Sequence, residues 1–402
     1  MPCRMLREDY EQAAPKLYGS MKNCTLNEHL FAAGPKRILA LDGGGIRGLL
    51  SLGYLKRIEE LLQARHGKEF RLCDYFDLVG GTSTGAIIAA GLALGRSVGE
   101  LQKLYQELAY EVFQKPFWRI GLFGAKFPTE PLVRALQAGF GDIALGDEEL
   151  RTGLVVITKR LDTGSPWVIH NNPRGVFFDP QSGEAPVIAN RKFLLRQVLR
   201  ASTAAPHYFE PERIEVGPGI DGVFVDGGIS PHNNPALQLL LVATLSGFGL
   251  HWPLAAEKLL LVSVGTGFRE VRFSPEEVMS MPAAMLSVRA LASMASDCDW
   301  LTQTLLQWMS ESPTHWQIDQ EIGNLAGDSL GGRRLFSYLR YNVQLKSGWL
   351  KENLDIALGE QQAASLFDMD DPGNVAALSS LGAAAARVQV RAEHFPACFD
   401  VG

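Results

Sequence analysis

The stretch Phe76-Asp77-Leu78-Val79-Gly80-Gly81-Thr82-Ser83-Thr84-Gly85-Ala86-Ile87-Ile88 combines an apolar strand, a glycine-rich turn and the start of a helix of small residues. Within it, Gly81-Thr82-Ser83-Thr84-Gly85 matches the G-x-S-x-G nucleophile elbow, a sharp strand-to-helix turn that exposes a serine. The flanking glycines leave no side chain in the way, and the first N–H groups of the helix favour negative charge nearby. In a chain with 41 glycines, the same pattern can also be an ordinary tight turn. The strand before it and the helix after it favour a serine nucleophile.

The composition is that of an ordinary globular protein. Of the 402 residues, 46% are hydrophobic and 20% charged, enough for a sizeable core. The net charge of −6 gives no reason to expect a nucleic acid polymer as partner. Five scattered cysteines without a C-x-x-C pair argue against both a disulfide framework and a zinc site. We therefore expect a protein of a reducing compartment.

Two segments bear on membrane insertion. Residues 1–22 mix charges of both signs and lack the apolar run of a secretory signal. Residues 227–256 contain no Asp, Glu, Lys or Arg, but glycines, His251 and Pro253 interrupt the apolar run before it reaches a spanning length. A buried helix beginning at Pro235 fits better, because proline suits the first helical turn. The sequence predicts a cytoplasmic protein.

A second glycine-rich loop precedes the elbow. The apolar run at residues 38–41 is typical of a central parallel strand, and it ends in Asp42-Gly43-Gly44-Gly45-Ile46-Arg47-Gly48. These glycines fit the G-x-G-x-x-G dinucleotide fingerprint, but the acidic residue expected at the end of a second strand is missing. The alternative is a nest of backbone N–H groups that binds an anion, as an oxyanion hole does.

The remaining chain alternates strands and helices. We expect strands at 154–158, 167–170, 223–225 and 259–264, and helices at 49–62, 98–113 and 191–200. From about residue 274 onward the pattern is mostly helical. Residues 113–127 interleave aromatic and basic side chains, which fits either a long loop over the core or an interfacial cap over the active site.

A serine nucleophile needs a base. Among the histidines, His207, His232 and His251 are the candidates, and for each a structural role is the simpler interpretation. Asp226 is the stronger candidate, because it ends a strand, where ligand sites of open α/β sheets cluster. Burial would raise its pKa and make it a better base.

Three blocks in this order carry a family resemblance: the loop Asp42–Gly48, the elbow Gly81–Gly85, and Asp226-Gly227-Gly228. Together they closely resemble the patatin-like phospholipase family, which carries D-G-G-G-x-R-G, G-x-S-x-G and D-G-G or D-G-A. The segment Ala204-Ala205-Pro206 before Tyr208-Phe209 is similar to the family too. The resemblance covers roughly residues 36–267.

The resemblance implies a three-layer α/β fold, with a mostly parallel sheet between helices and a helical C-terminal elaboration. It implies a phospholipase A type lipid acyl hydrolase in which Ser83 attacks the ester and Asp226 acts as base. The backbone of Gly43, Gly44 and Gly45, with Thr84, would form the oxyanion hole, and no metal or organic cofactor is implied. Arg47 would either fix the glycine loop or meet an anionic head group. The remaining motif positions would support the site: Asp42, Gly48, Gly81, Gly85, Gly227 and Gly228.

The expected organisation is an arm at residues 1–34, the phospholipase domain at 35–273 and a helical region at 274–402 packed on it. Such an enzyme would act on phospholipid as a peripheral protein at the inner membrane surface. Some bacterial relatives are antiphage effectors that a cyclic oligonucleotide switches on, and we hypothesise the same here. The rival function is a non-catalytic nucleotide- or anion-binding protein that uses the Gly43–Gly48 loop.

Overall fold

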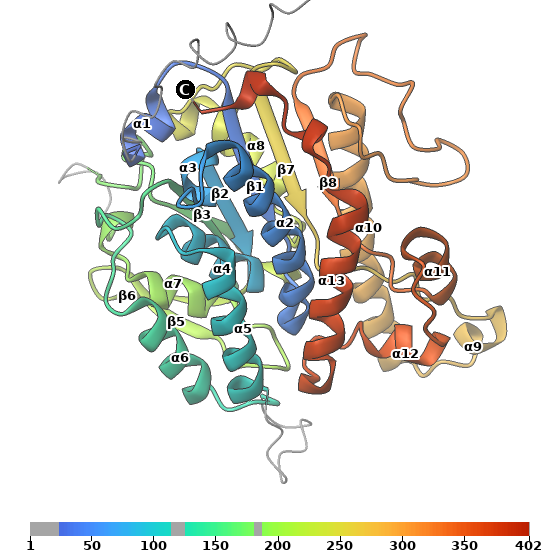
Figure 1. The fold of residues 1–402 in the computed structure, drawn as a ribbon. Coiled ribbons are helices and arrows are strands. Elements are labelled where there is room, and N and C mark those ends of the chain that lie inside the picture. Colours follow the sequence, from blue (N-terminus) through green and yellow to red (C-terminus); the bar gives the residue numbers. More distant parts are fainter. Residues whose placement is uncertain (1–23, 114–124, 181–186, 402) are drawn as a thin grey trace, which may run out of the picture.

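The computed structural model describes residues 24–113, 125–180 and 187–401. Within them lies an eight-stranded sheet in the order β5-β6-β3-β2-β1-β7-β8, with β4 also paired to β3 (Figure 1). The strands are β1 (Lys36–Leu41), β2 (Leu78–Thr82), β3 (Gly153–Arg160), β4 (Ser165–His170), β5 (Glu212–Gly217), β6 (Ile220–Asp226), β7 (Leu259–Val264) and β8 (Ser337–Tyr341).

The centre of the sheet is parallel. Strand β1 pairs in parallel with β2 and β7, β2 with β3, and β7 with β8. Strands β4, β5 and β6 add antiparallel pairs at one side. Parallel strands covered on both faces are continuously apolar, as β1 and β7 are over most of their length. The prediction of a mostly parallel central sheet is confirmed.

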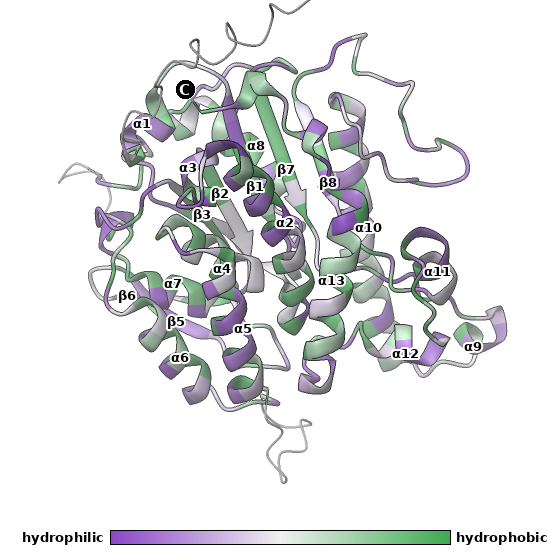
Figure 2. Cartoon of the chain, in the orientation of Figure 1, coloured by the Kyte–Doolittle hydropathy of each residue, from purple (hydrophilic) through white to green (hydrophobic). Residues whose placement is uncertain are grey.

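Helices cover both faces, and alternate residues of each strand point to opposite faces. In β1, Leu39 and Leu41 pack with helices α2, α4 and α5, whereas Ile38 and Ala40 pack with α8. Figure 2 shows β7, one of the central strands, coloured as hydrophobic over most of its length. The three-layer prediction is confirmed.

The α-helices are α1 (Leu26–Phe31), α2 (Gly48–His66), α3 (Leu72–Tyr75), α4 (Thr84–Ala93), α5 (Val98–Val112), α6 (Glu130–Phe140), α7 (Leu195–Ser202), α8 (Ala236–Thr244), α9 (Pro275–Met279), α10 (Ala283–Met309), α11 (Ser347–Leu354), α12 (Glu360–Ser365) and α13 (Val375–Gln389).

Helix α13 packs directly on α2 (Figure 1). The two backbones approach closely at Gly53 and Gly382, where a Cβ on Gly382 would lie 2.6 Å from the carbonyl oxygen of Leu50. Any side chain at these two positions would force the helices apart. The C-terminal region is thus packed into the same body as the sheet.

That region also supplies a strand that the sequence pattern does not predict. Ser337–Tyr341 forms β8 and extends the parallel sheet beyond β7. The charged Arg340 interrupts the apolar pattern of these residues. The strand is therefore not recognised from the spacing of its apolar residues. The helices expected from residue 274 onward are otherwise present as α9 to α13.

Other predicted elements appear with shifted ends. The helix expected at 191–200 is α7, and the buried helix at Pro235 is α8, with Pro235 as its N-cap. Most of the predicted cap, residues 114–124, and most of the N-terminal arm, residues 1–23, lie outside the described residues. Every helix in the described part of the chain falls short of the length or apolar character needed to cross a bilayer.

Candidate active site

Ser83 occupies a strained turn between β2 and α4. Its backbone angles are φ +56° and ψ −124°, a conformation that non-glycine residues rarely adopt. A Cβ on Gly81 would lie 2.1 Å from the carbonyl carbon of Gly85, and one on Gly85 would lie 2.2 Å from the carbonyl oxygen of Leu41. Only glycine fits at both positions. This is the geometry of a nucleophile elbow.

Ser202, at the end of α7, holds the elbow from behind. Its hydroxyl accepts a hydrogen bond from the Ser83 N–H at 2.8 Å and donates one to the carbonyl oxygen of Ile157 at 2.6 Å. Ser202 is fully buried, so both bonds are shielded from water. The strained backbone of Ser83 is therefore anchored to β3.

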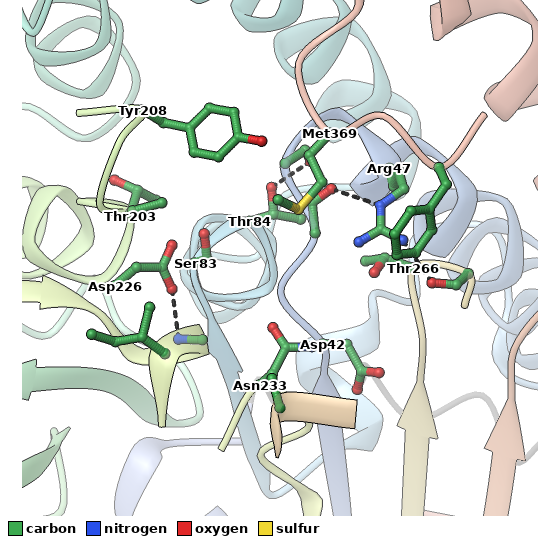
Figure 3. Close-up of a pocket in the computed structure, with 18 of the residues that line it drawn as sticks. Asp42, Arg47, Ser83, Thr84, Thr203, Tyr208, Asp226, Asn233, Thr266 and Met369 are labelled. Carbon is green, nitrogen blue, oxygen red and sulfur yellow. Dashed lines mark hydrogen bonds between the residues drawn. The ribbon is translucent and has the colours of Figure 1, made fainter. Parts of the chain in front are cut away.

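The register of β3 brings Asp226 to Ser83. On β3, Ile157 pairs with Thr82 of β2, and the next residue, Thr158, pairs with Asp226 of β6. Ser83 directly follows Thr82, so the ends of β2 and β6 meet beside β3. Figure 3 shows the Ser83 hydroxyl facing the Asp226 carboxyl group.

The Asp226 carboxyl group is buried, and burial raises its pKa to about 6. Hydrogen bonds from the Ser83 hydroxyl and the Gly228 N–H, the latter at 2.7 Å, stabilise the ionised form and limit the rise. The backbone N–H of Asp226 donates to the carbonyl oxygen of Ala204 at 3.0 Å. A carboxylate with this pKa is ionised at neutral pH and basic enough to accept a proton.

The glycine loop lies on the other side of Ser83 from Asp226 (Figure 3). The Gly43 N–H donates to the carbonyl oxygen of Asn233 at 3.0 Å, so it is engaged elsewhere and is not free to bind an oxyanion. The backbone N–H groups of Gly44, Gly45 and Thr84 meet no acceptor among the described residues. Gly45 has φ +59°, and a Cβ there would lie 2.3 Å from the carbonyl oxygen of Met369. The conformation of the loop thus depends on glycine at this position.

Arg47 lines the active-site cavity and also holds the glycine loop. Its side chain is buried and donates to the carbonyl oxygens of Gly44 at 3.3 Å and Gly267 at 2.8 Å. The guanidinium also lies over the ring of Phe367, 4.3 Å from its centroid. Of the two roles that the sequence left open, the contacts of the side chain fit loop support.

Asp42, at the start of the loop, forms a buried bidentate ion pair with Arg340 of β8. Oδ2 and Oδ1 lie 2.6 and 2.9 Å from the two terminal nitrogens of Arg340, and one of these nitrogens also donates to Ser263 Oγ at 2.8 Å. Both side chains are at most 6% exposed. The C-terminal region therefore anchors the first residue of the glycine loop.

Ser83 opens into a cavity of about 470 Å³. Most of its wall is apolar, which suits a hydrocarbon chain. Polar groups of the wall include Ser83, Asp226 and the glycine loop (Figure 3). Apolar side chains of this wall include Ile87, Leu108, Val112, Phe113, Leu132 and Phe209.

The candidate histidines do not enter this cavity. His207 and His251 are exposed, and His232 is half-buried, with its carbonyl oxygen accepting from the Thr82 hydroxyl. None of the three lines the cavity. Within the described residues, no group of three His, Cys, Asp or Glu side chains comes together to hold a metal ion.

Sequence reasoning missed several residues of the site. Asp299 of α10 lines the cavity, and burial, with the nearby Asp42 charge, raises its pKa to about 7. Ser202, Arg340 and Met369 support the elbow or the loop through contacts across long sequence separations. No local pattern marks these four residues. The nearest signal to Ser202 was the family-like segment Ala204-Ala205-Pro206, which begins two residues further along the chain.

The chain is similar to a known protein family and to several of its members. Residues 39–240 match the family model described as patatin-like phospholipase. A cGAMP-activated phospholipase of Vibrio cholerae is 30% identical over 60% of this chain and 67% of its own length. A cGAMP-activated phospholipase of Escherichia coli is 27% identical over 60% of this chain and 64% of its own length. Patatin-04/09 of Solanum tuberosum is 26% identical over 71% and 76% of the two chains. The chain belongs to the patatin-like phospholipase family of lipid acyl hydrolases.

Proposed function

We propose that this protein cleaves phospholipid acyl esters through a dyad of Ser83 and Asp226. The observation that carries the proposal is the register of β3, which brings the strained Ser83 and the buried Asp226 together at the apolar cavity. A serine alone at such a turn would lack a base. Asp226 supplies one, and no histidine lines the cavity among the described residues.

In the first step the Asp226 carboxylate accepts the proton of the Ser83 hydroxyl while Oγ attacks the ester carbonyl carbon. The carbonyl oxygen becomes an oxyanion, which the N–H groups of Gly44, Gly45 and Thr84 would bind. Collapse of this intermediate releases the lysophospholipid, whose alkoxide takes the proton from Asp226. Water then gives a proton to the same carboxylate and attacks the acyl-serine. The second intermediate collapses to the fatty acid as Asp226 returns this proton to Ser83 Oγ.

Gly43 is left out of this donor set, because its N–H already binds Asn233. The residue after the nucleophile usually gives one oxyanion donor, which supports the role of Thr84. The Thr84 hydroxyl contributes separately, because it donates to the carbonyl oxygen of Gly45 at 2.7 Å and so ties the elbow to the glycine loop.

We further propose that a cyclic oligonucleotide controls the enzyme. The support is the similarity to two phospholipases named cGAMP-activated. An unregulated phospholipase would attack the membrane of its own cell, so activation only on infection fits a role in antiviral defence. In this proposal the protein acts in the cytoplasm as a peripheral enzyme on the inner membrane surface. The division into an arm at residues 1–34, a phospholipase domain at 35–273 and a helical region at 274–402 packed on that domain stays a prediction.

The test is product analysis by mass spectrometry on mixed phospholipid vesicles, with and without cGAMP. Wild type should release fatty acid and lysophospholipid, and Ser83→Ala should lose at least about 10⁴-fold in rate. Binding of cGAMP by Ser83→Ala should persist, which controls for folding. Equal product release from both proteins would disprove the nucleophile. A protein that binds anions but never hydrolyses lipid would support the non-catalytic alternative instead.

A further inference from the structure

A second large cavity lies beside the active site, in the C-terminal half of the molecule. Its volume is about 920 Å³, and its wall comes from the segment after β7, from α10, from residues 313–320 and from α11. Four aromatic rings cluster in it: Phe268, Trp300, Trp316 and Trp349. Nothing in the proposed reaction uses this cavity, which we call the aromatic cavity.

The four rings form one connected group. Trp316 and Trp349 are stacked, with centroids 5.7 Å apart and planes inclined by 16°. Phe268 meets Trp316 and Trp300 edge-on, at centroid distances of 5.4 and 5.6 Å. Flat aromatic surfaces of this kind are platforms for planar heterocycles such as nucleobases.

Cations lie at the rim of the same cavity. Arg272 is 84% exposed and pairs with Glu270 at 3.0 Å, and Arg391 is 64% exposed and lies 3.8 Å from Glu393. Exposed ion pairs of this kind are weak, so both guanidinium groups can turn to an anionic ligand. Deeper in the wall, Nε2 of His315 is buried and has no hydrogen-bond partner among the described residues. The cavity thus combines stacking surface with donors for an anion.

The aromatic cavity is connected to the oxyanion loop through one short segment. Phe268 lines both the aromatic cavity and the active-site cavity. Just before it, the Thr266 hydroxyl donates to the carbonyl oxygen of Gly43 at 2.7 Å, and the carbonyl oxygen of Gly267 accepts from Arg47 at 2.8 Å. A ligand that shifts Phe268 would therefore move the residues that hold the glycine loop.

We propose that the aromatic cavity is the binding site of the activating cyclic oligonucleotide. A base would stack on the Trp316–Trp349 pair, and a phosphate would bind Arg272 at the rim. Occupancy would reposition Phe268 and, through Thr266 and Gly267, the oxyanion loop. This inference rests on the proposed function, because it assumes that such an activator exists.

The test is isothermal titration of the full-length protein with cGAMP, followed by other cyclic di- and trinucleotides. Ser83→Ala is used, so that binding is measured without hydrolysis. Three of the seven tryptophans line the cavity, so binding should also change tryptophan fluorescence. Arg272→Ala and Trp349→Ala should each weaken binding about tenfold or more while the melting temperature stays within a few degrees.

Matched controls separate this site from general effects of charge or packing. Arg213 is 74% exposed and pairs with Asp221 at 3.2 Å, so Arg213→Ala removes a similar surface ion pair elsewhere. Trp308 lies on α10 but outside the cavity, so Trp308→Ala controls for the loss of a tryptophan. Both controls should bind cGAMP as wild type does.

Equal affinity of the cavity variants and their controls would overturn the site. So would binding of glycerophosphocholine or inorganic phosphate with no binding of any cyclic nucleotide. Failure of the proposed function looks different: cGAMP would bind in the aromatic cavity, yet wild type would release no lipid product. If wild type hydrolyses lipid on addition of cGAMP but the cavity variants respond at the same concentration, the function stands and the site is wrong.

Discussion

The two sides of the active-site cavity are built in different ways. On one side, Ser83 and Asp226 sit at the ends of two strands, and each belongs to a short motif visible in the sequence. On the other side, the glycine loop is held by Arg340, Phe367 and Met369, which lie about 300 residues further along the chain. The proposed reacting groups are thus encoded locally, whereas the glycine loop depends on tertiary contacts with the C-terminal region. Substitutions on the first side should lower the rate of hydrolysis. Substitutions on the second side should lower the stability of the fold and change the response to the activator.

The largest effect is expected on the first side. Asp226→Asn removes the proposed base but keeps the shape of the side chain, so we expect turnover to fall about 10⁴-fold with the fold intact. The measurement is hydrolysis of a soluble short-chain ester, with circular dichroism as the folding control. Near-normal turnover would contradict the dyad and would favour one of the candidate histidines as the base.

On the second side, Arg340→Met should leave Asp42 as a buried charge without its partner. Loss of one member of a buried pair costs about 3 to 5 kcal/mol of unfolding free energy. Urea unfolding followed by fluorescence measures it. The control Arg213→Met breaks an exposed pair and should cost no more than about 1 kcal/mol. Equal losses of unfolding free energy in the two variants would show that the buried Asp42–Arg340 pair stabilises the fold no more than an exposed ion pair does.

Gly45→Ala tests the junction between the two sides. Its Cβ would collide with Met369 and the residue would have φ +59°, so the loop must move and an oxyanion donor is lost. We expect turnover to drop about 10²- to 10³-fold. Gly164→Ala has a similar φ of +70° with no atom within 4 Å of the new Cβ, so it carries the backbone strain alone. Its turnover should be that of wild type, and a similar loss in both variants would contradict the account.

Asp226→Asn should also stabilise the protein. Burial raises the Asp226 pKa from 3.8 to about 6, so stability from this group is full below pH 4 and is lost as pH rises through 6. At pH 7 the ionised carboxylate costs about 3 kcal/mol, which the neutral amide avoids. The melting temperature of Asp226→Asn should therefore exceed that of wild type at pH 7, and the gap should close at pH 4. A lower melting temperature at pH 7 would argue against a buried charge.

The smallest effect concerns pH. If Asp226 is the base, it must be ionised, so kcat/KM should be constant above about pH 7 and fall about tenfold at pH 5, following the Asp226 pKa of about 6. The profile is measured on a soluble ester to avoid changes in vesicle charge. Constant activity down to pH 5 would mean that the carboxyl group is not the base or that its pKa is not raised.

The sequence predicts the first side well, because strand ends, glycine turns and the residues that follow them are local features. It predicted β2, β6 and β7 and the positions of Ser83 and Asp226 at the ends of the first two. It missed β8, because the charge of Arg340 in a buried strand makes sense only with Asp42, far away in the chain, beside it. The engagement of the Gly43 N–H could not be foreseen either, since its acceptor is a backbone carbonyl of Asn233 brought close only by folding.

The most direct test of the central claim is covalent labelling of the full-length protein with a fluorophosphonate, which reacts only with activated serines. The account predicts that peptide mass spectrometry finds the label on Ser83 after incubation with cGAMP, and that Asp226→Asn is labelled at least about 10²-fold more slowly. Labelling of another serine, or equal rates for wild type and Asp226→Asn, would contradict it.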